Sequence, residues 1–209
     1  MVRQSARRQT AAGGRKQMET YLFASDIHGS AYYCRKLLET FQKSGAKKLI
    51  LLGDILYHGP RNDLPREYAP KEVIAMLNSL KDKILCVRGN CEAEVDQMVL
   101  AFPCMADYAV LMLNGHVFYA THGHIFNTED GGRKLPPMNA GEVLVHGHTH
   151  LPVAERFQAA DGREIFWLNP GSVSIPKGGN PNSFGLLTGD IFRIYDFEGN
   201  VLKEICIAS

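Results

Sequence analysis

Three common sequence features are missing from this chain of 209 residues, and each absence argues against a class of protein. None of its apolar runs approaches the roughly 20 residues that a membrane-spanning helix needs, and its start lacks the apolar stretch of a secretory signal. Its five cysteines form an odd, scattered set without a C-x-x-C pair, which favours reduced thiols over a disulfide framework. We therefore expect a soluble, cytoplasmic protein that does not contact a membrane.

Acidic residues are missing from the first seventeen positions. Five of the 23 lysines and arginines lie there, which leaves 18 against 22 acidic residues in the remainder, a net charge of −4. That balance argues against nucleic-acid binding by bulk attraction to phosphate. We interpret residues 1–17 as a disordered basic extension, either a transit peptide or, as we favour, sequence ahead of an alternative start at Met18. Residues 18–209 then form a single domain.

From residue 18 the chain alternates short apolar runs with helical patterns, which indicates β-α-β units. Strands are expected at 21–24, 49–52 and 84–87, and helices at 32–43 and 70–80. After residue 105 the pattern changes to strands joined by turn signals such as Asn-Gly at 114–115 and Asp-Gly at 161–162. The second half should therefore consist mostly of hairpins.

Each of five apolar runs is followed by side chains that commonly bind metals. They are Asp26 and His28 after the first strand, Asp54 after the second, Asn90 after the third, His122 after residues 117–120, and His148 and His150 after residues 143–145. In an open α/β sheet the carboxyl ends of the strands border one crevice, so these segments can converge. The pattern therefore makes a metal cluster at the strand ends possible.

The order of these blocks is D-x-H, G-D, G-N, an isolated His and G-H-x-H, and it resembles the calcineurin-like metallophosphoesterase superfamily. Agreement is closer still with its small bacterial phosphodiesterases of the YfcE type. The resemblance spans residues 19–207 and includes the stretches FASDIHGS, LGDILYHGPRN, VRGNCEAEVDQM, THGHIF, VHGHTHLPVAE and NPGSVSIPKGGN. The single fragments are weak evidence, whereas their ordered set is specific.

The resemblance implies an α/β fold with four layers, an αββα sandwich of two mixed β-sheets flanked by helices. It also implies two divalent metal ions, about 3.5 to 4 Å apart, that turn a bridging water into a hydroxide for in-line attack at phosphorus. Carried over by position, the first ion is bound by Asp26, His28 and His150, the second by Asn90, His122 and His148, and both by Asp54. Asp54, Asn90 and His122 are also catalytic candidates, and Cys91, which follows Asn90, is a fourth.

This donor set combines four imidazole nitrogens with three oxygens, which suits Mn, Fe or Zn better than Ca or Mg. A carboxylate at Asp54 can bridge two cations with its two oxygens, whereas the neutral amide of Asn90 adds an oxygen without further charge. The resemblance favours Mn²⁺, with Zn²⁺, Fe²⁺ or Ni²⁺ as alternatives.

Cys91 departs from the superfamily pattern, which has a histidine after G-N that assists the leaving group. A thiol with a pKa of about 8.5 replaces an imidazolium poorly at neutral pH, so we expect a preference for esters with good leaving groups unless His124 supplies the proton. A small buried structural residue is the alternative interpretation of Cys91. His124 is also a candidate for lining the substrate pocket.

The loop after Asp54 contains two further substrate-binding candidates, Arg61 and His58, and Arg61 has the forked geometry that suits phosphate. Solvated loop side chains are the alternative for both. Lys177 is expected to be solvated, with substrate contact as its alternative, and His146 to serve the structure.

Together these patterns predict a metal-dependent phosphodiesterase that acts on small phosphodiesters. One alternative is a phosphomonoesterase acting on nucleotides or phosphoproteins. Another, from a different class, is a non-catalytic scaffold with the same fold, which the complete set of metal-ligand positions disfavours. Relatives associate as homodimers or larger assemblies, so a homo-oligomer is compatible with the resemblance.

Overall fold

Alternate side chains of strand β1 (Thr20–Ala24) contribute to two different hydrophobic cores. Leu22 and Ala24 pack on the helix side, whereas Tyr21 and Phe23 pack against a second sheet. Successive side chains of a strand point to opposite faces, and a run buried on both faces is apolar throughout. The sequence of this strand, TYLFA, is therefore that of a central strand between two layers.

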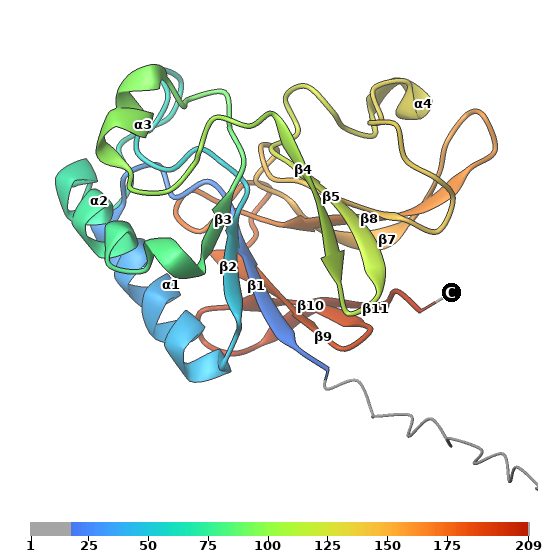
Figure 1. Ribbon diagram of the computed structural model, residues 1–209. Coiled ribbons are helices and arrows are strands. Elements are labelled where there is room, and N and C mark those ends of the chain that lie inside the picture. The colour runs from blue at the N-terminus through green and yellow to red at the C-terminus, as the bar shows by residue number, and fades with distance from the viewer. Residues whose placement is uncertain (1–17, 209) are drawn as a thin grey trace, which may run out of the picture.

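The computed structural model describes residues 18–208, in which two mixed β-sheets face each other (Figure 1). The first sheet has the strand order β11-β10-β9-β1-β2-β3, and β1 pairs in parallel with β2, as β2 does with β3. Its other strands are β2 (Lys48–Leu51), β3 (Ile84–Cys86), β9 (Ser183–Thr188), β10 (Ile191–Asp196) and β11 (Val201–Cys206).

Helices cover the outer face of the first sheet (Figure 1). α1 (Ala31–Ser44) begins at Ser30, whose hydroxyl accepts a hydrogen bond from the Tyr33 N–H, and ends at Gly45 in the left-handed region. α2 (Pro70–Asn78) begins with proline, which suits the first helical turn. The short η1 (Lys81–Lys83) and α3 (Glu94–Val99) complete this side, and α3 was not predicted.

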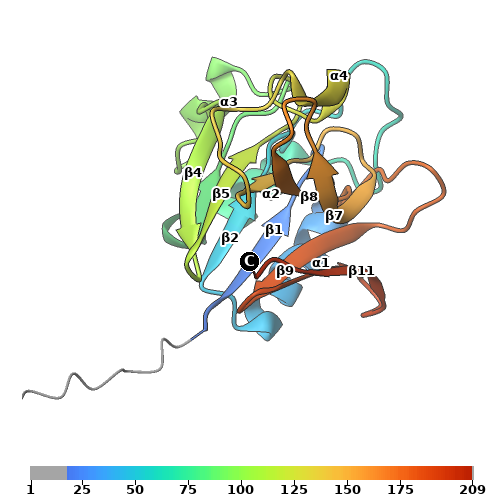
Figure 2. The same ribbon diagram turned by 90° about the vertical axis from the view of Figure 1, so that its right-hand side faces the viewer.

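The second sheet has the order β4-β5-β6-β8-β7. β4 and β5 form a hairpin, as do β7 and β8, but β6 is the exception to the hairpin pattern because it pairs in parallel with both β5 and β8. In the rotated view, β7 and β8 lie above β9 and β11 of the first sheet (Figure 2). The strands are β4 (Tyr108–Leu113), β5 (His116–Thr121), β6 (Val143–Val145), β7 (Pro152–Gln158) and β8 (Glu164–Pro170).

Aromatic side chains fill the space between the sheets. The Phe23 ring stacks on Phe118 at 5.8 Å between centroids and meets Phe192 edge-on at 5.5 Å. The outer face of the second sheet is covered by the short α4 (Glu129–Gly132) and the segment after it, through Met138. The predicted fold of two mixed sheets is confirmed, with its larger helices all on one side.

Two further expectations concern the whole chain. All five cysteines are free thiols, as their spacing indicated. In the part of the chain that the structure describes, no helix has the length and apolar character to cross a membrane. The predicted basic extension, residues 1–17, lies outside the described residues.

Candidate metal centre

Five loops that follow β1, β2, β3, β5 and β6 meet at one edge of the two sheets, and backbone hydrogen bonds join them. The Asp26 N–H donates to the Gly53 carbonyl over 3.1 Å, and the His28 N–H donates to the Asp54 carbonyl over 2.9 Å. In the second sheet, the Gly147 N–H donates to the His122 carbonyl over 2.9 Å. Backbone hydrogen bonds therefore contribute to fixing the relative positions of these loops.

One group of ligand-type atoms forms around Asp26. Its Oδ1 lies 3.2 Å from His150 Nε2 and 3.6 Å from His28 Nε2. His28 Nε2 in turn lies 3.7 Å from Asp54 Oδ2. Asp26, His28 and His150 are all buried, so this group lies at the bottom of the site.

A second group forms around His122 Nε2. This nitrogen lies 3.4 Å from Asp54 Oδ2, 3.2 Å from Asn90 Oδ1 and 3.2 Å from His148 Nδ1. Asn90 is exposed and His148 half-buried, so this group is the more open of the two. Asp54 Oδ2 belongs to both groups, and the structure thus brings together all seven side chains proposed as metal ligands.

Three of the four imidazoles are oriented by a backbone carbonyl. His28, His122 and His150 each have Nδ1 against a carbonyl, of Tyr57 at 2.7 Å, of Leu52 at 2.6 Å and of Ile175 at 2.6 Å respectively. A carbonyl only accepts, so each Nδ1 carries the proton and each Nε2 presents a lone pair to the cluster. The His148 ring has the opposite orientation, so that its Nδ1, and not its Nε2, faces the cluster.

The cluster has the chemistry of a cation site. Asp26 Oδ1 and His28 Nε2 are buried without a hydrogen-bond partner among the described residues, which is costly unless something else satisfies them. Burial alone would lower the pKa of His122, but contact with Asp54 and the charge of Asp26 raise it to about 9, so the surroundings favour a positive charge at Nε2, which either a proton or a metal ion can supply. Converging lone pairs with uncompensated carboxylate charge fit divalent metal ions.

Backbone strain is concentrated at the same residues. Five of the seven have φ in the left-handed region, which non-glycine residues rarely adopt: Asp26 (59°), His28 (49°), Asp54 (56°), His148 (66°) and His150 (60°). Each such residue costs about 1–3 kcal/mol and persists only where surrounding contacts impose it. Strain of this kind clusters at functional sites.

Buried hydroxyls and one buried carboxylate hold the backbone at Asp26 and Asp54. Ser172 and Ser174 both donate to the Asp26 carbonyl at 3.0 Å. Glu92 accepts from three backbone N–H groups, those of Asp54 at 2.9 Å, Ile55 at 2.7 Å and Gly89 at 2.5 Å. Glu92 therefore joins the loops after β2 and β3, a role that no feature of its sequence context indicated.

Two glycines allow these loops to approach closely. A Cβ at Gly89 would collide with Asp54 Oδ1, and a Cβ at Gly147 would collide with the Ser25 hydroxyl. Only glycine can occupy these positions while the ligand side chains keep their places.

Cys91 is attached to Asp54 by two contacts. Its backbone N–H donates to Oδ1 over 2.9 Å, and its thiol donates to Oδ2 over 3.3 Å. Burial, reinforced by the negative charge of Asp54, raises the pKa of the Cys91 thiol far above its usual value. The thiol therefore stays protonated at neutral pH.

His124 and His58 lie beside the cluster rather than in the cleft above it. Burial and the neighbouring His122 and His148 lower the pKa of His124 to about 4, so its imidazole is neutral at pH 7. The His58 ring packs edge-on against the rings of Tyr57 and Tyr68. Neither imidazole lines the cleft.

His146, the first imidazole of the V-H-G-H-T-H stretch, directly follows β6 and is buried. Its Nε2 accepts a hydrogen bond from Trp167 Nε1 over 2.8 Å, and its Nδ1 donates to the Gly147 carbonyl over 3.0 Å. Both ring nitrogens are thus satisfied within the protein, and His146 supports the loop that carries His148.

An open cleft of about 480 Å³ lies over the cluster. Its walls combine five of the proposed ligands with further, mostly polar residues of the surrounding loops: Gly59, Pro60, Arg61, Asn62, Cys91, Glu129, Thr149 and Lys177. Of the three substrate-binding candidates proposed from the sequence, Arg61 alone lines it. The volume is that of a small-molecule site.

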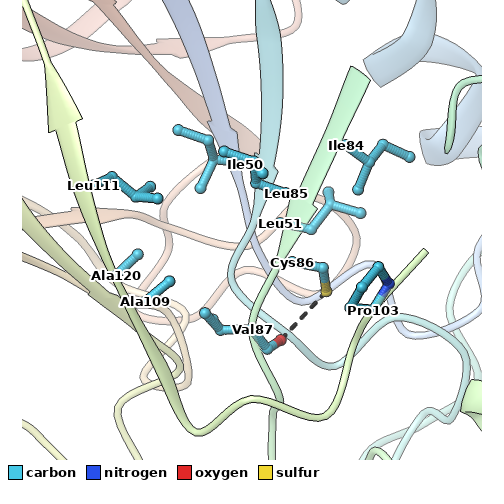
Figure 3. A pocket seen from close by; sticks show the side chains of 10 residues that line it. All are labelled: Ile50, Leu51, Ile84, Leu85, Cys86, Val87, Pro103, Ala109, Leu111 and Ala120. Carbon is cyan, nitrogen blue, oxygen red and sulfur yellow. Dashed lines mark hydrogen bonds between the residues drawn. The ribbon is translucent and has the colours of Figure 1, made fainter. Parts of the chain in front are cut away.

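A smaller cavity of about 120 Å³ lies between β3 and β4, away from the cluster (Figure 3). Apolar side chains line it, including Ile50, Leu85 and Leu111. Its one sulfur atom, of Cys86, donates to the Val87 carbonyl, and burial holds the Cys86 pKa well above its usual value (Figure 3). Reactive groups are therefore found in the polar cleft and not in this cavity.

Comparison with known proteins agrees with this geometry. The calcineurin-like phosphoesterase superfamily domain matches residues 20–190. The chain is 51% identical to Phosphodiesterase YfcE of Escherichia coli strain K12 over 191 residues, which cover 91% of this chain and 99% of the relative. It is 24% identical to the probable metallophosphoesterase YsnB of Bacillus subtilis, with 88% of this chain and 95% of the relative covered.

Solved structures show the same fold. The structure of Yfce, a phosphoesterase from E. coli, superposes with a TM-score of 0.84 at 47% identity and covers 90% of this chain and all of that one. An archaeal phosphodiesterase superposes with a TM-score of 0.55 at 21% identity, which shows likeness of fold alone. The chain therefore belongs to the calcineurin-like phosphoesterase superfamily and is a hydrolase of phosphoric esters.

Proposed function

We propose that this chain is a metal-dependent phosphodiesterase that hydrolyses small phosphodiesters at a site for two divalent metal ions. The observation that carries the proposal is the place of Asp54 Oδ2, within 3.7 Å of His28 Nε2 and 3.4 Å of His122 Nε2. One ion would be held by Asp26, His28 and His150, the other by Asn90, His122 and His148, with Asp54 shared. The nitrogen-rich donor set supports Mn²⁺, with Zn²⁺, Fe²⁺ and Ni²⁺ as alternatives.

Two ions bound there would neutralise the phosphoryl oxygens and make water a competent nucleophile at neutral pH. The protein's own part is to hold seven donors in place. Carbonyls fix three imidazole rings, and Glu92 fixes the loops of Asp54 and Asn90. Because Asn90 is neutral, the site keeps more positive charge toward an anionic ester than an aspartate there would leave.

The leaving group determines which ester fits best. The Cys91 thiol is held by Asp54, and the neutral His124 lies outside the cleft, so neither supplies a proton readily at pH 7. Esters whose alcohol leaves as a stable anion are then favoured. The 51% identity to a protein named phosphodiesterase supports diesters over monoesters.

The direct test compares two chromogenic esters with the same leaving group. Bis-p-nitrophenyl phosphate and p-nitrophenyl phosphate are assayed side by side with Mn²⁺, and the diester is expected to give the larger kcat/KM. Faster release from the monoester would reverse the assignment. Failure of both, with metal bound, would favour the scaffold alternative.

The proposal also covers the cellular compartment of the enzyme and the class of its substrate. Five free thiols fit a reducing compartment, so we infer that the enzyme acts in the cytoplasm. The net charge of −4 outside residues 1–17 supports a small-molecule substrate over nucleic acid. Formation of a homo-oligomer is proposed only because relatives associate as homodimers or larger assemblies.

A further inference from the structure

Two cationic side chains in the cleft form no ion pair within residues 18–208. Most arginines of this part of the chain have an acidic partner, such as Arg35 with Glu72 and Arg88 with Asp107. The side chains of Arg61 and Lys177, in contrast, form neither a salt bridge nor a hydrogen bond with any described residue, although both residues line the cleft. Their charges are therefore available to a ligand.

Both cations stand on loops that are tied to the metal cluster. The Lys177 N–H donates to the His150 carbonyl over 3.2 Å, and the carbonyl two residues earlier orients the His150 ring. On the other loop, the Tyr57 carbonyl orients the His28 ring four residues before Arg61. His28 and His150 belong to the same group of ligands, so the two loops border the same side of the site.

The one further carboxylate of the cleft wall does not neutralise these cations. Glu129 is paired with Lys134 at 3.0 Å, and that contact holds the pKa of Glu129 below its usual value. The cleft wall thus keeps two uncompensated positive charges, in addition to those that metal ions would contribute.

A simple phosphodiester carries a single negative charge, which the metal ions would already balance. We propose that Arg61 and Lys177 form a subsite for a second phosphate group of the substrate, carried on the part that remains after the leaving group departs. Arginine binds phosphate with two parallel hydrogen bonds and lysine adds a point charge. A cleft of about 480 Å³ has room for a ligand of nucleotide size.

This inference rests on the proposed phosphodiesterase activity, so its test uses two esters that differ by one phosphate. They are thymidine 5′-(p-nitrophenyl phosphate) and the same ester with a 3′-phosphate, which release the same p-nitrophenolate. The parent enzyme with Mn²⁺ should prefer the 3′-phosphorylated ester by about tenfold in kcat/KM, mainly through a lower KM. The readout is this preference, because a change in overall rate affects both esters alike.

The variants R61Q and K177Q should each reduce the preference, and the double variant should reduce it to about one. K203Q is the matched control, since Lys203 is an exposed lysine on β11, outside the cleft and without an ion pair in the described chain, and it should keep the parent's preference. Equal kcat/KM for the two esters in the parent, or a preference that survives in the double variant, would overturn the subsite.

A binding measurement separates failure of the subsite from failure of the proposed function. Calorimetry with Mn²⁺-loaded protein compares thymidine 3′,5′-bisphosphate with thymidine 5′-phosphate. If neither ester is hydrolysed, the phosphodiesterase proposal fails, and tighter binding of the bisphosphate, lost in the double variant, still supports the subsite. Equal binding of the two nucleotides would contradict it.

Discussion

The Cys91 thiol donates a hydrogen bond to Asp54 Oδ2 over 3.3 Å, and this is the oxygen that both groups of metal-ligand atoms share. A superfamily position that usually carries an imidazole is here a neutral donor attached to the carboxylate that we propose as the bridge between two ions. The contact stabilises the Asp54 side chain. It also means that this position has no group that readily donates a proton to the leaving group.

The variant C91H should therefore gain activity on esters with poor leaving groups. An imidazolium can donate a proton near pH 7, and we expect a rise in kcat/KM of about 100-fold, the low end for general acid catalysis. A series of phenyl esters with leaving groups of increasing pKa measures this directly. The slope of log kcat/KM against that pKa should become shallower in C91H and stay steep in the control C91S.

Glu92 is predicted to be a main determinant of stability near the site. In E92A three buried N–H groups lose their acceptor, and each unsatisfied group costs about 1–3 kcal/mol. The free energy of unfolding, measured with urea on metal-free protein, should fall by about 3 kcal/mol or more. The exposed Glu155, which has no ion pair in the described chain, provides the control E155Q, expected to change stability by at most about 0.5 kcal/mol. Equal effects of the two variants would contradict this role.

Stability should fall with acid partly through His146. Burial lowers the pKa of His146 from 6.5 to about 4, so between these values the unfolded chain binds a proton that the folded chain does not. This contribution is complete above pH 6.5 and decreases as the pH falls toward 4. At about 1.4 kcal/mol per unit, the decrease from this group is about 3 kcal/mol.

Urea denaturation at pH 4.5 to 7.5, with EDTA present throughout, isolates this effect. The variant H146F should start from a lower stability, because the Trp167 N–H loses its acceptor, but should show a weaker pH dependence than the parent. Parallel pH curves for parent and variant would show that His146 does not titrate as described.

The variant D54N should separate charge from shape at the shared position. Asparagine keeps the size of the side chain but removes the negative charge between the two proposed ions. We expect kcat on bis-p-nitrophenyl phosphate to fall by at least about 100-fold, together with weaker Mn²⁺ binding. Circular dichroism checks that the fold is kept. Turnover near the parent level would mean that Asp54 does not have the bridging role.

Local sequence patterns predicted much of the fold because apolar runs and their flanking residues carry the information. The strand observed at Lys48–Leu51 lies within one residue of the expected 49–52, and α1 lies within one residue of the expected 32–43 at each end. The helix α3 was missed because none of its residues is buried, so it has no apolar face to produce a pattern. The parallel pairing of the three-residue β6 depends on tertiary contacts alone.

The candidate site, like the fold, could be predicted from the sequence only in part. The seven proposed ligands were recognisable because each follows an apolar run and their order matches a family. The carbonyls that orient the imidazoles, such as those of Leu52 and Ile175, carry no side-chain signal and are identified only by the fold. Glu92 belongs to the same class, since its partners are backbone N–H groups from another loop.

We propose that seven side chains hold two ions, one on either side of Asp54. Anomalous diffraction from crystals grown with Mn²⁺ tests it most directly. Two peaks are expected, one among Asp26, His28 and His150 and the other among Asn90, His122 and His148, with the Asp54 carboxylate between them. A single peak at saturating Mn²⁺, or peaks away from these side chains, would contradict it.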